Sequence, residues 1–510
     1  MAEQAVQTDG TAASAEHFDV LIIGAGISGI GAAWHLQQHT PERSYAILEA
    51  EDTFGGTWET HKYPGIRSDS DLFTFGYKFK PWVGAPIATA EEINRYLREV
   101  LDENDIERHI RYNHWIDTAE YDRATQRWTL TATDRTSGTT RRVSCQFLWM
   151  CQGYYRHDTP YTPEWKGMAD FRGDIIHPQQ WPEDYDYSGK RVLVIGSGAT
   201  AATVVPAMAD KAGHVTMLQR SPTYFAAGLN RNEMADTLRE LDVPDEWVHE
   251  ITRRKINFDQ KEINRRSHEE PEVVKAELLA MAQEILGEDF DYATHFTPNY
   301  RPWQQRLAFL PDGDLFQAIR DGKASVVTDH IDRFVENGVR LKSGEVLEAD
   351  LILTATGFDL SVMGDIEFRV DDQPVDFSKT TTWRGMMFDG VPSMVWVFGY
   401  FRASWTLRAD LIAEVVCRLL NQMAARGDGL VEPVVPAELE GMARKDWVEA
   451  DNFNPGYLRR SMHKMPKQGD REPWIHKQDY WVEKDELPKI SFDDRSLRFA
   501  PDASQAQSAG

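Results

Sequence analysis

The chain has 510 residues, a formal net charge of −25 and three cysteines. Its length predicts two or three domains with a sizeable core, and its acidic balance excludes a nucleic-acid partner, which needs a basic surface. Cys145, Cys151 and Cys417 have no metal-ligand or redox spacing, which indicates core residues in a reducing compartment. No apolar run reaches the roughly 18 residues of a membrane span. The polar residues 1–16 predict a disordered tail without the build of a signal peptide, and we expect a cytoplasmic protein.

The first predicted strand opens a dinucleotide fingerprint. Residues 18–23 form a short apolar run typical of a buried parallel strand, and a helical pattern follows the next turn. In that turn Gly24 permits a tight bend, Gly26 lets the backbone approach a pyrophosphate, and Gly29 lets helix and strand pack closely. The next predicted strand ends at Glu49, about 20 residues past the glycines, where a carboxylate can accept hydrogen bonds from a ribose.

A second glycine-rich turn follows that strand and favours FAD over NAD. Gly56, Thr57 and Trp58 stand where FAD-binding oxidoreductases commonly place such a turn against the cofactor. The stretch runs on to Asp69 in the pattern Gly-Gly-x-Trp, four residues, Tyr-Pro-Gly, three residues, Asp. So long a pattern is not expected of an ordinary loop with a solvated Asp.

The chain then carries a linker with the pattern Phe-x-Gly-x-x-x-His-x-x-x-Trp-Pro. Its fixed positions are Phe171, Gly173, His177 and Trp181. On residue types alone, the aromatic rings fit core packing and the histidine fits a turn cap. A linker between two dinucleotide-binding domains, however, sets the distance between two redox rings. We predict that His177 serves domain geometry rather than proton transfer.

A second strand–turn–helix pattern directly follows this linker. The fingerprint positions after residues 191–195 are Gly196, Gly198, Thr200 and Ala201. Alanine in place of the third glycine is allowed in such turns. The next strand ends before Arg220 and Ser221, where a protein that binds NAD would carry an acid. Arg220 can pair with a 2′-phosphate through a charge-assisted fork, so NADPH is favoured over NADH.

The remaining chain predicts helices around the two domains. Residues 228–297 are charged and helical, with Pro271 placed to start a helix and Gly287 to stop it. We expect a helical insertion, and a role as a lid over the substrate is left open. A long amphipathic helix starts near Ser404 and stops near Gly427. Its dipole can stabilise a reduced flavin, and simple packing explains it equally well.

Taken together, these motifs resemble those of the type I Baeyer–Villiger monooxygenases, a branch of the flavin-containing monooxygenases. The linker pattern with Trp181 and the motif that ends at Asp69 carry the resemblance. The likeness covers nearly the whole chain from about residue 18 to 500. The region of Arg306 and the stretch from Asn454 to Arg471 are similar to the ethionamide-activating subgroup.

The resemblance implies a reaction and two catalytic residues. It places Arg306 as the active-site arginine and Asp69 as its partner near the flavin ring. With FAD, NADPH and dioxygen, such enzymes convert ketones to esters or lactones through a C4a-peroxyflavin, and they oxidise sulfides and thioamides as a side activity. Many relatives carry Lys before the arginine and use it on the NADPH phosphate. Here that position is Gln305, so NADPH is expected to bind more weakly or to depend more on Arg220.

The predicted fold class is α/β, with two Rossmann-like dinucleotide-binding domains, for FAD and NADPH, and a helical insertion. We assign residues 17–158 and 350–495 to a discontinuous FAD-binding domain and 159–349 to the NADPH-binding domain. The insertion spans about 228–297, and 496–510 are expected to be a flexible tail. The strand at 351–354 and the Ala-Thr-Gly after it are interpreted as the return to the FAD domain.

Two other classes remain as alternatives. A flavin-containing N- or S-monooxygenase without Baeyer–Villiger activity is disfavoured by Trp181-Pro182 and the complete Asp69 motif. A pyridine nucleotide–disulfide reductase shares the architecture but needs a redox cysteine pair, which this sequence lacks. The expected partners are dioxygen and a small ketone or sulfide, and the expected state is a monomer or weak homo-oligomer.

Overall fold

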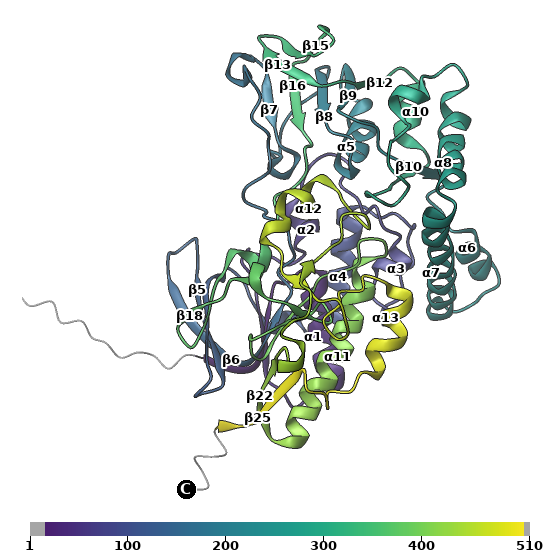
Figure 1. Ribbon diagram of the computed structural model, residues 1–510. Coiled ribbons are helices and arrows are strands. Elements are labelled where there is room, and N and C mark those ends of the chain that lie inside the picture. The colour runs from purple at the N-terminus through teal and green to yellow at the C-terminus, as the bar shows by residue number, and fades with distance from the viewer. Residues whose placement is uncertain (1–15, 504–510) are drawn as a thin grey trace, which may run out of the picture.

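The computed structural model describes residues 16–503 and shows two α/β halves (Figure 1). The tail expected over residues 1–16 therefore lies outside the described residues except for Glu16, which begins the first strand. Within residues 16–503, no helix is long and apolar enough to cross a membrane.

The first half is built on a nine-stranded sheet whose central strands are parallel. Strand β1 (Glu16–Ile23) lies between β2 (Tyr45–Leu48) and β6 (Thr140–Met150). The other strands are β3 (Ile110–Arg111), β4 (Trp115–Asp122), β5 (Arg127–Thr133), β17 (Glu367–Val370), β18 (Gln373–Pro374) and β21 (Met394–Trp396). The residues of β1 from Val20 on are buried, because both faces of the sheet are covered.

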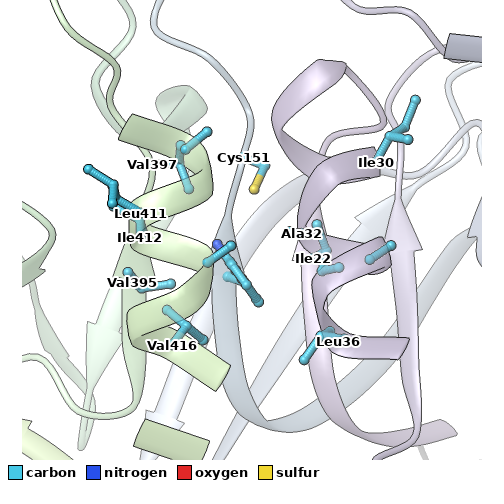
Figure 2. Close-up of a cluster of buried hydrophobic side chains, with 14 of the residues drawn as sticks. Ile22, Ile30, Ala32, Leu36, Cys151, Val395, Val397, Leu411, Ile412 and Val416 are labelled. Carbon is cyan, nitrogen blue, oxygen red and sulfur yellow. The ribbon is translucent and has the colours of Figure 1, made fainter. Parts of the chain in front are cut away.

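Two helices far apart in the sequence pack together on this sheet. Figure 2 shows Ile22 of β1 and Leu36 of α1 (Ile27–His39) in one apolar cluster with Ile412 and Val416 of α11 (Trp405–Arg426). The Ser28 hydroxyl of α1 accepts a hydrogen bond from the indole nitrogen of Trp405 at 2.8 Å. The start of α11 is thereby held against the first glycine turn.

The second half is a five-stranded parallel sheet. Its order is β12 (Ala324–Thr328), β9 (His214–Gln219), β8 (Arg191–Ile195), β16 (Leu351–Thr354) and β7 (Asp174–Ile176). The domain boundary expected at residue 350 is wrong, because β16 pairs with β7 and β8 in this sheet. The chain rejoins the first sheet only at β17. Part of the expected linker is also a strand, since β7 forms the edge of this sheet.

Residues 228–297 contain four helices, which lie in the sequence between strands β10 (Phe225–Gly228) and β11 (Ala308–Pro311). The two strands pair with each other in parallel. The helices are α6 (Glu233–Glu240), α7 (Asp245–Glu269), α8 (Pro271–Leu286) and α9 (Tyr292–His295). Arg253 of α7 is buried and donates hydrogen bonds to the carbonyl oxygens of Phe73, Thr74 and Gly76 at 3.0, 3.1 and 2.9 Å. The insertion is therefore anchored to the first half of the molecule.

The flexible tail expected from residue 496 is also wrong in part. Residues of β25 (Leu497–Pro501) pair antiparallel with β22 (Asp428–Pro433), and Ser496 is buried. The Ser496 hydroxyl accepts a hydrogen bond from the Trp383 indole at 2.8 Å. Residues 504–510 lie outside the described part of the chain.

Candidate functional site

The first glycine turn joins β1 to α1 and faces a cavity. Gly24 has φ +101°, and a Cβ there would lie 2.8 Å from the Cys151 carbonyl oxygen. A Cβ on Gly29 would lie 1.9 Å from the Gly24 carbonyl oxygen, so the helix packs as closely as predicted. A Cβ on Gly26 would meet only the Cα of Gly56, at 3.7 Å. The protein itself therefore does not require glycine at position 26, and the space in front of it remains for a ligand.

Glu49 holds this turn to the end of β2. Its carboxylate accepts hydrogen bonds from the backbone N–H groups of Ala25 at 2.6 Å and Glu51 at 3.0 Å. Burial raises the pKa of Glu49, and these backbone bonds oppose the rise. Glu49 lines the cavity together with Gly56, Thr57 and Trp58 at the start of α2 (Thr57–Thr60). The predicted ribose contact of Glu49 stays a prediction.

The second glycine turn joins β8 to α5 (Ala199–Ala209) and faces the same cavity. Gly196 has φ +139°, and a Cβ there would lie 2.2 Å from the Ala355 carbonyl oxygen. A Cβ on Gly198 would meet nothing within 4 Å, so this face of the turn is open. Thr200 lines the cavity, whereas Ala201 is fully buried and packs in the core of this half. Ala201 therefore packs in the core of this half, and its predicted cofactor contact stays a prediction.

Arg220 and Ser221 follow the end of β9 and line the cavity. Both side chains are exposed. Among residues 16–503, Arg220 has no ion-pair or hydrogen-bond partner. A free guanidinium beside an open glycine turn is suited to an anionic group of a ligand.

Arg306 and Asp69 form an ion pair at the cavity wall. Arg306 Nε donates to Asp69 Oδ2 at 2.6 Å, and Nη2 donates to Oδ1 at 2.5 Å. Both residues line the cavity. Burial acts to raise the pKa of Asp69, but the Arg306 guanidinium outweighs it and holds that pKa below its usual value. The same Asp69 raises the pKa of Arg306 against the effect of burial, so both groups are charged.

The Tyr-Pro-Gly part of the Asp69 motif packs against the second half. Tyr63 is buried in the core of that half, beside Thr200. Gly65 has φ +75°, and a Cβ there would lie 2.5 Å from the Ala207 Cβ of α5. A second ion pair, Arg67 to Asp314 at 2.6 Å, joins the same segment to the start of α10 (Asp314–Arg320). The motif therefore fixes the two glycine turns relative to each other.

The four signature positions lie behind the cavity wall rather than on it. Phe171 packs edge-on against Phe334, and a Cβ on Gly173 would lie 2.4 Å from the Asp350 carbonyl oxygen. His177 Nδ1 accepts a hydrogen bond from the Gln179 backbone, and burial lowers the pKa of His177 to about 4. Trp181 packs edge-on against Tyr185 and Tyr187. The role in domain geometry stays a prediction.

Both glycine turns, Glu49, Arg220, Ser221 and the Arg306–Asp69 pair line one cavity of about 1280 Å³, whereas Gly29, Ala201 and the four signature positions do not line it. This volume exceeds the roughly 300–1,000 Å³ of a site for one drug-sized ligand. Sequence reasoning missed several of its residues. They are Tyr154, Tyr155, Trp405, Tyr457 and Arg460. Their only sequence signals were an aromatic pair after Gly153 and the Pro-Gly-Tyr-Leu-Arg-Arg stretch, which on its own predicts no site.

A two-half α/β protein whose glycine turns share one cavity has the architecture of a protein that binds two dinucleotides. The described residues hold no group of three or more His, Cys, Asp or Glu that could bind a metal ion. The three cysteines are buried and unpaired, and burial raises the pKa of each thiol, to about 12 in Cys417. This arrangement does not suit a disulfide reductase.

Comparisons with known proteins agree with this class. The family model for pyridine nucleotide-disulphide oxidoreductases matches residues 21–305. The FAD-containing monooxygenase EthA of Mycolicibacterium smegmatis is 46% identical over 486 residues, 95% of this chain and 97% of that protein. The probable FAD-binding monooxygenase AlmA of Acinetobacter baylyi is 42% identical over 95% of this chain and 96% of that protein. The chain belongs to the family of FAD-containing monooxygenases, which confirms the family predicted from the sequence.

The fold is confirmed by solved structures. Cyclohexanone monooxygenase from Rhodococcus sp. Phi1, bound to NADP+, matches with a TM-score of 0.73 at 21% identity. The match covers 96% of this chain and 100% of that one.

Proposed function

We propose that this FAD monooxygenase uses NADPH and dioxygen to convert ketones to esters or lactones, with oxidation of sulfides and thioamides as a side activity. The observation that carries the proposal is the Arg306–Asp69 pair at the wall of a cavity shared by both glycine turns. When bound, FAD supplies the chemistry with oxygen and NADPH supplies the hydride.

The residues present fit both dinucleotides. In the proposal, the turn at Gly24–Gly29 and Glu49 hold FAD, since the N-terminus of α1 and the open face of Gly26 suit a pyrophosphate. The turn at Gly196–Gly198 holds NADPH, and Gly198 leaves the backbone uncovered there. Arg220 selects the 2′-phosphate, because its guanidinium is exposed and has no carboxylate partner in the described residues.

Arg306 contributes a fixed positive charge to the reaction site. The two hydrogen bonds to Asp69 orient the guanidinium, so its remaining N–H groups are available to negative charge that develops on oxygen. A pre-oriented charge in a water-poor cavity stabilises such an oxygen without reorganisation. Asp69 acts through Arg306 and is a positioning residue.

The alternative is an N- or S-monooxygenase that makes no ester. One molecule that carries both a methyl ketone and a thioether separates the two. FAD-loaded protein with NADPH and air is expected to give ester and sulfoxide by mass spectrometry. Sulfoxide alone would replace the proposal with the alternative. Arg306→Ala is expected to keep FAD and its reduction by NADPH but to lose the ester, and Arg320→Ala, on the exposed face of α10, is the matched control.

A further inference from the structure

Three tyrosines from distant segments meet beside Arg306. Tyr154 and Tyr155 follow Gly153 after the end of β6, and Tyr457 lies in α12 (Gly456–Ser461). Figure 1 shows α12 and α2 at the level where the two halves meet. All three tyrosines line the cavity that Arg306 lines. None of them takes part in the two glycine turns or in the ion pair with Asp69.

Neighbouring rings fix where the phenols lie. The Tyr154 ring stacks on the Trp405 indole with centroids 5.2 Å apart and planes 7° apart. The Tyr155 ring lies 4.3 Å from that of Phe358, and edge-on to Tyr457 at 6.2 Å. Because rings packed against other aromatic rings have little rotational freedom, the hydroxyl groups at their ends have defined positions.

The hydroxyls form a group of hydrogen-bond donors. Tyr154 Oη donates to Tyr155 Oη at 2.6 Å, so the Tyr155 hydroxyl, as an acceptor, keeps its own proton to donate. Burial raises the pKa of all three phenols, while the nearby Arg306 guanidinium opposes the rise. They are therefore neutral donors in the neutral pH range. Arg306 adds further N–H donors at the same wall, and its charge is balanced by Asp69.

We propose that the hydroxyls of Tyr155 and Tyr457, positioned by Tyr154, bind the carbonyl oxygen of the substrate next to Arg306. The inference rests on the proposed function and names the chemical group that this site selects. An uncharged carbonyl oxygen accepts two hydrogen bonds, whereas a thioether sulfur is a weak acceptor and leaves the phenols unpaired. When the carbonyl carbon is attacked, its oxygen gains negative charge and these bonds strengthen. The phenols keep their protons throughout.

The site therefore distinguishes carbonyl compounds from sulfides within one enzyme. A site built to hydrogen-bond a polar group discriminates strongly against ligands that lack it, because its own donors are then left unsatisfied. Tyr155→Phe and Tyr457→Phe remove one hydroxyl each and keep the ring, so the packing on Phe358 is retained. Tyr112→Phe, a half-buried tyrosine that hydrogen-bonds to Glu107 outside the cavity, is the matched control.

The test compares acetophenone, a phenyl methyl ketone, with thioanisole, a phenyl methyl sulfide, in FAD-loaded protein with NADPH and air. Both site variants are expected to lower kcat/KM for ester formation by 10-fold or more and to leave sulfoxide formation within about twofold. Binding of benzamide, an unreactive carbonyl ligand, is measured by calorimetry. We expect its dissociation constant to be at least fivefold higher in both variants than in the wild type. Tyr112→Phe should match the wild type in all three measurements.

Two results would overturn the inference. Equal losses for acetophenone and thioanisole would show that the tyrosines only support the structure. An unchanged dissociation constant for benzamide in both variants would show that the hydroxyls do not recognise the carbonyl. If the wild-type protein makes no ester at all, the proposed function fails, and the benzamide measurement still decides whether the carbonyl site exists.

Discussion

The Asp69 carboxylate receives two hydrogen bonds from the Arg306 guanidinium, although 237 positions separate the two residues. Asp69 comes from the motif that packs against α5, and Arg306 precedes β11 in the other half of the molecule. The pair therefore spans the two halves at the cavity that both glycine turns share. The geometry of this ion pair therefore depends on how the two halves are docked.

The first prediction concerns this pair. Asp69→Asn keeps the shape of the side chain but removes the charge that orients the guanidinium. We expect normal FAD content, a loss of ester formation of tenfold or more, and a larger share of NADPH consumed as hydrogen peroxide. Ester yield per NADPH is the measurement. An unchanged yield would show that Asp69 does not position Arg306.

The second prediction concerns the choice between NADPH and NADH. Arg220→Gln removes the cationic side chain that follows β9, while Gln305 provides no charge. We expect kcat/KM for NADPH to fall about 10- to 100-fold and that for NADH to change little, because a charged hydrogen bond contributes about 1.5–3 kcal/mol. The dissociation constants of 2′,5′-ADP and of 5′-AMP, measured separately, give the same comparison without turnover. Equal losses for both coenzymes would contradict the assignment.

The third prediction concerns the anchor of the helical insertion. Arg253→Met leaves the Phe73 and Gly76 carbonyls without this donor, whereas the Thr74 carbonyl keeps a hydrogen bond from the Thr406 hydroxyl. The substitution also removes the guanidinium 3.8 Å from Asp410. We expect a loss of stability on the order of 3 kcal/mol, because buried unsatisfied acceptors cost about 1–3 kcal/mol each. The neighbour Arg254 is exposed and, among residues 16–503, pairs only with Glu250, so Arg254→Met is the matched control. Thermal unfolding that is equal in both variants would rule out the anchor.

The fourth prediction concerns pH. Burial lowers the pKa of His177 to about 4 in the folded protein, against about 6.5 when unfolded. The unfolded chain therefore binds a proton first as pH falls, and stability is lost between about pH 6.5 and 4. The loss is on the order of 1–3 kcal/mol for this histidine. His177→Asn should flatten the pH dependence of thermal unfolding across that window. An unaltered slope in His177→Asn would contradict the buried, neutral state.

Local patterns predicted the glycine turns well, because a strand, a tight turn and a helix start are decided by neighbouring residues. Gly24, Gly29 and Gly196 all lie where a Cβ would meet backbone atoms. The resemblance also paired Arg306 with Asp69, which spacing alone does not reveal. The site assignments themselves remain predictions until a cofactor contact is measured.

The features that could not be predicted from the sequence depend on contacts between distant segments of the chain. Strand β16 pairs with β7 and β8, and β25 (Leu497–Pro501) pairs with β22. In each case the paired strands are far apart in the sequence. Tyr457 reaches Arg306 only because α12 returns to the cavity from the C-terminal third. Arg253 lies within the charged, helical stretch 228–297, where no motif singles it out, yet it is buried against carbonyls of the first half.

The most direct test of the central claim follows the oxygen atom. FAD-loaded protein is supplied with NADPH, ¹⁸O₂ and a panel of linear, cyclic and aryl ketones, and the products are analysed by mass spectrometry. We expect an ester or lactone that carries one ¹⁸O atom, with one NADPH consumed for each molecule of product. Sulfoxide from a thioether under the same conditions, with no labelled ester from any ketone, would contradict it and leave a heteroatom oxidiser.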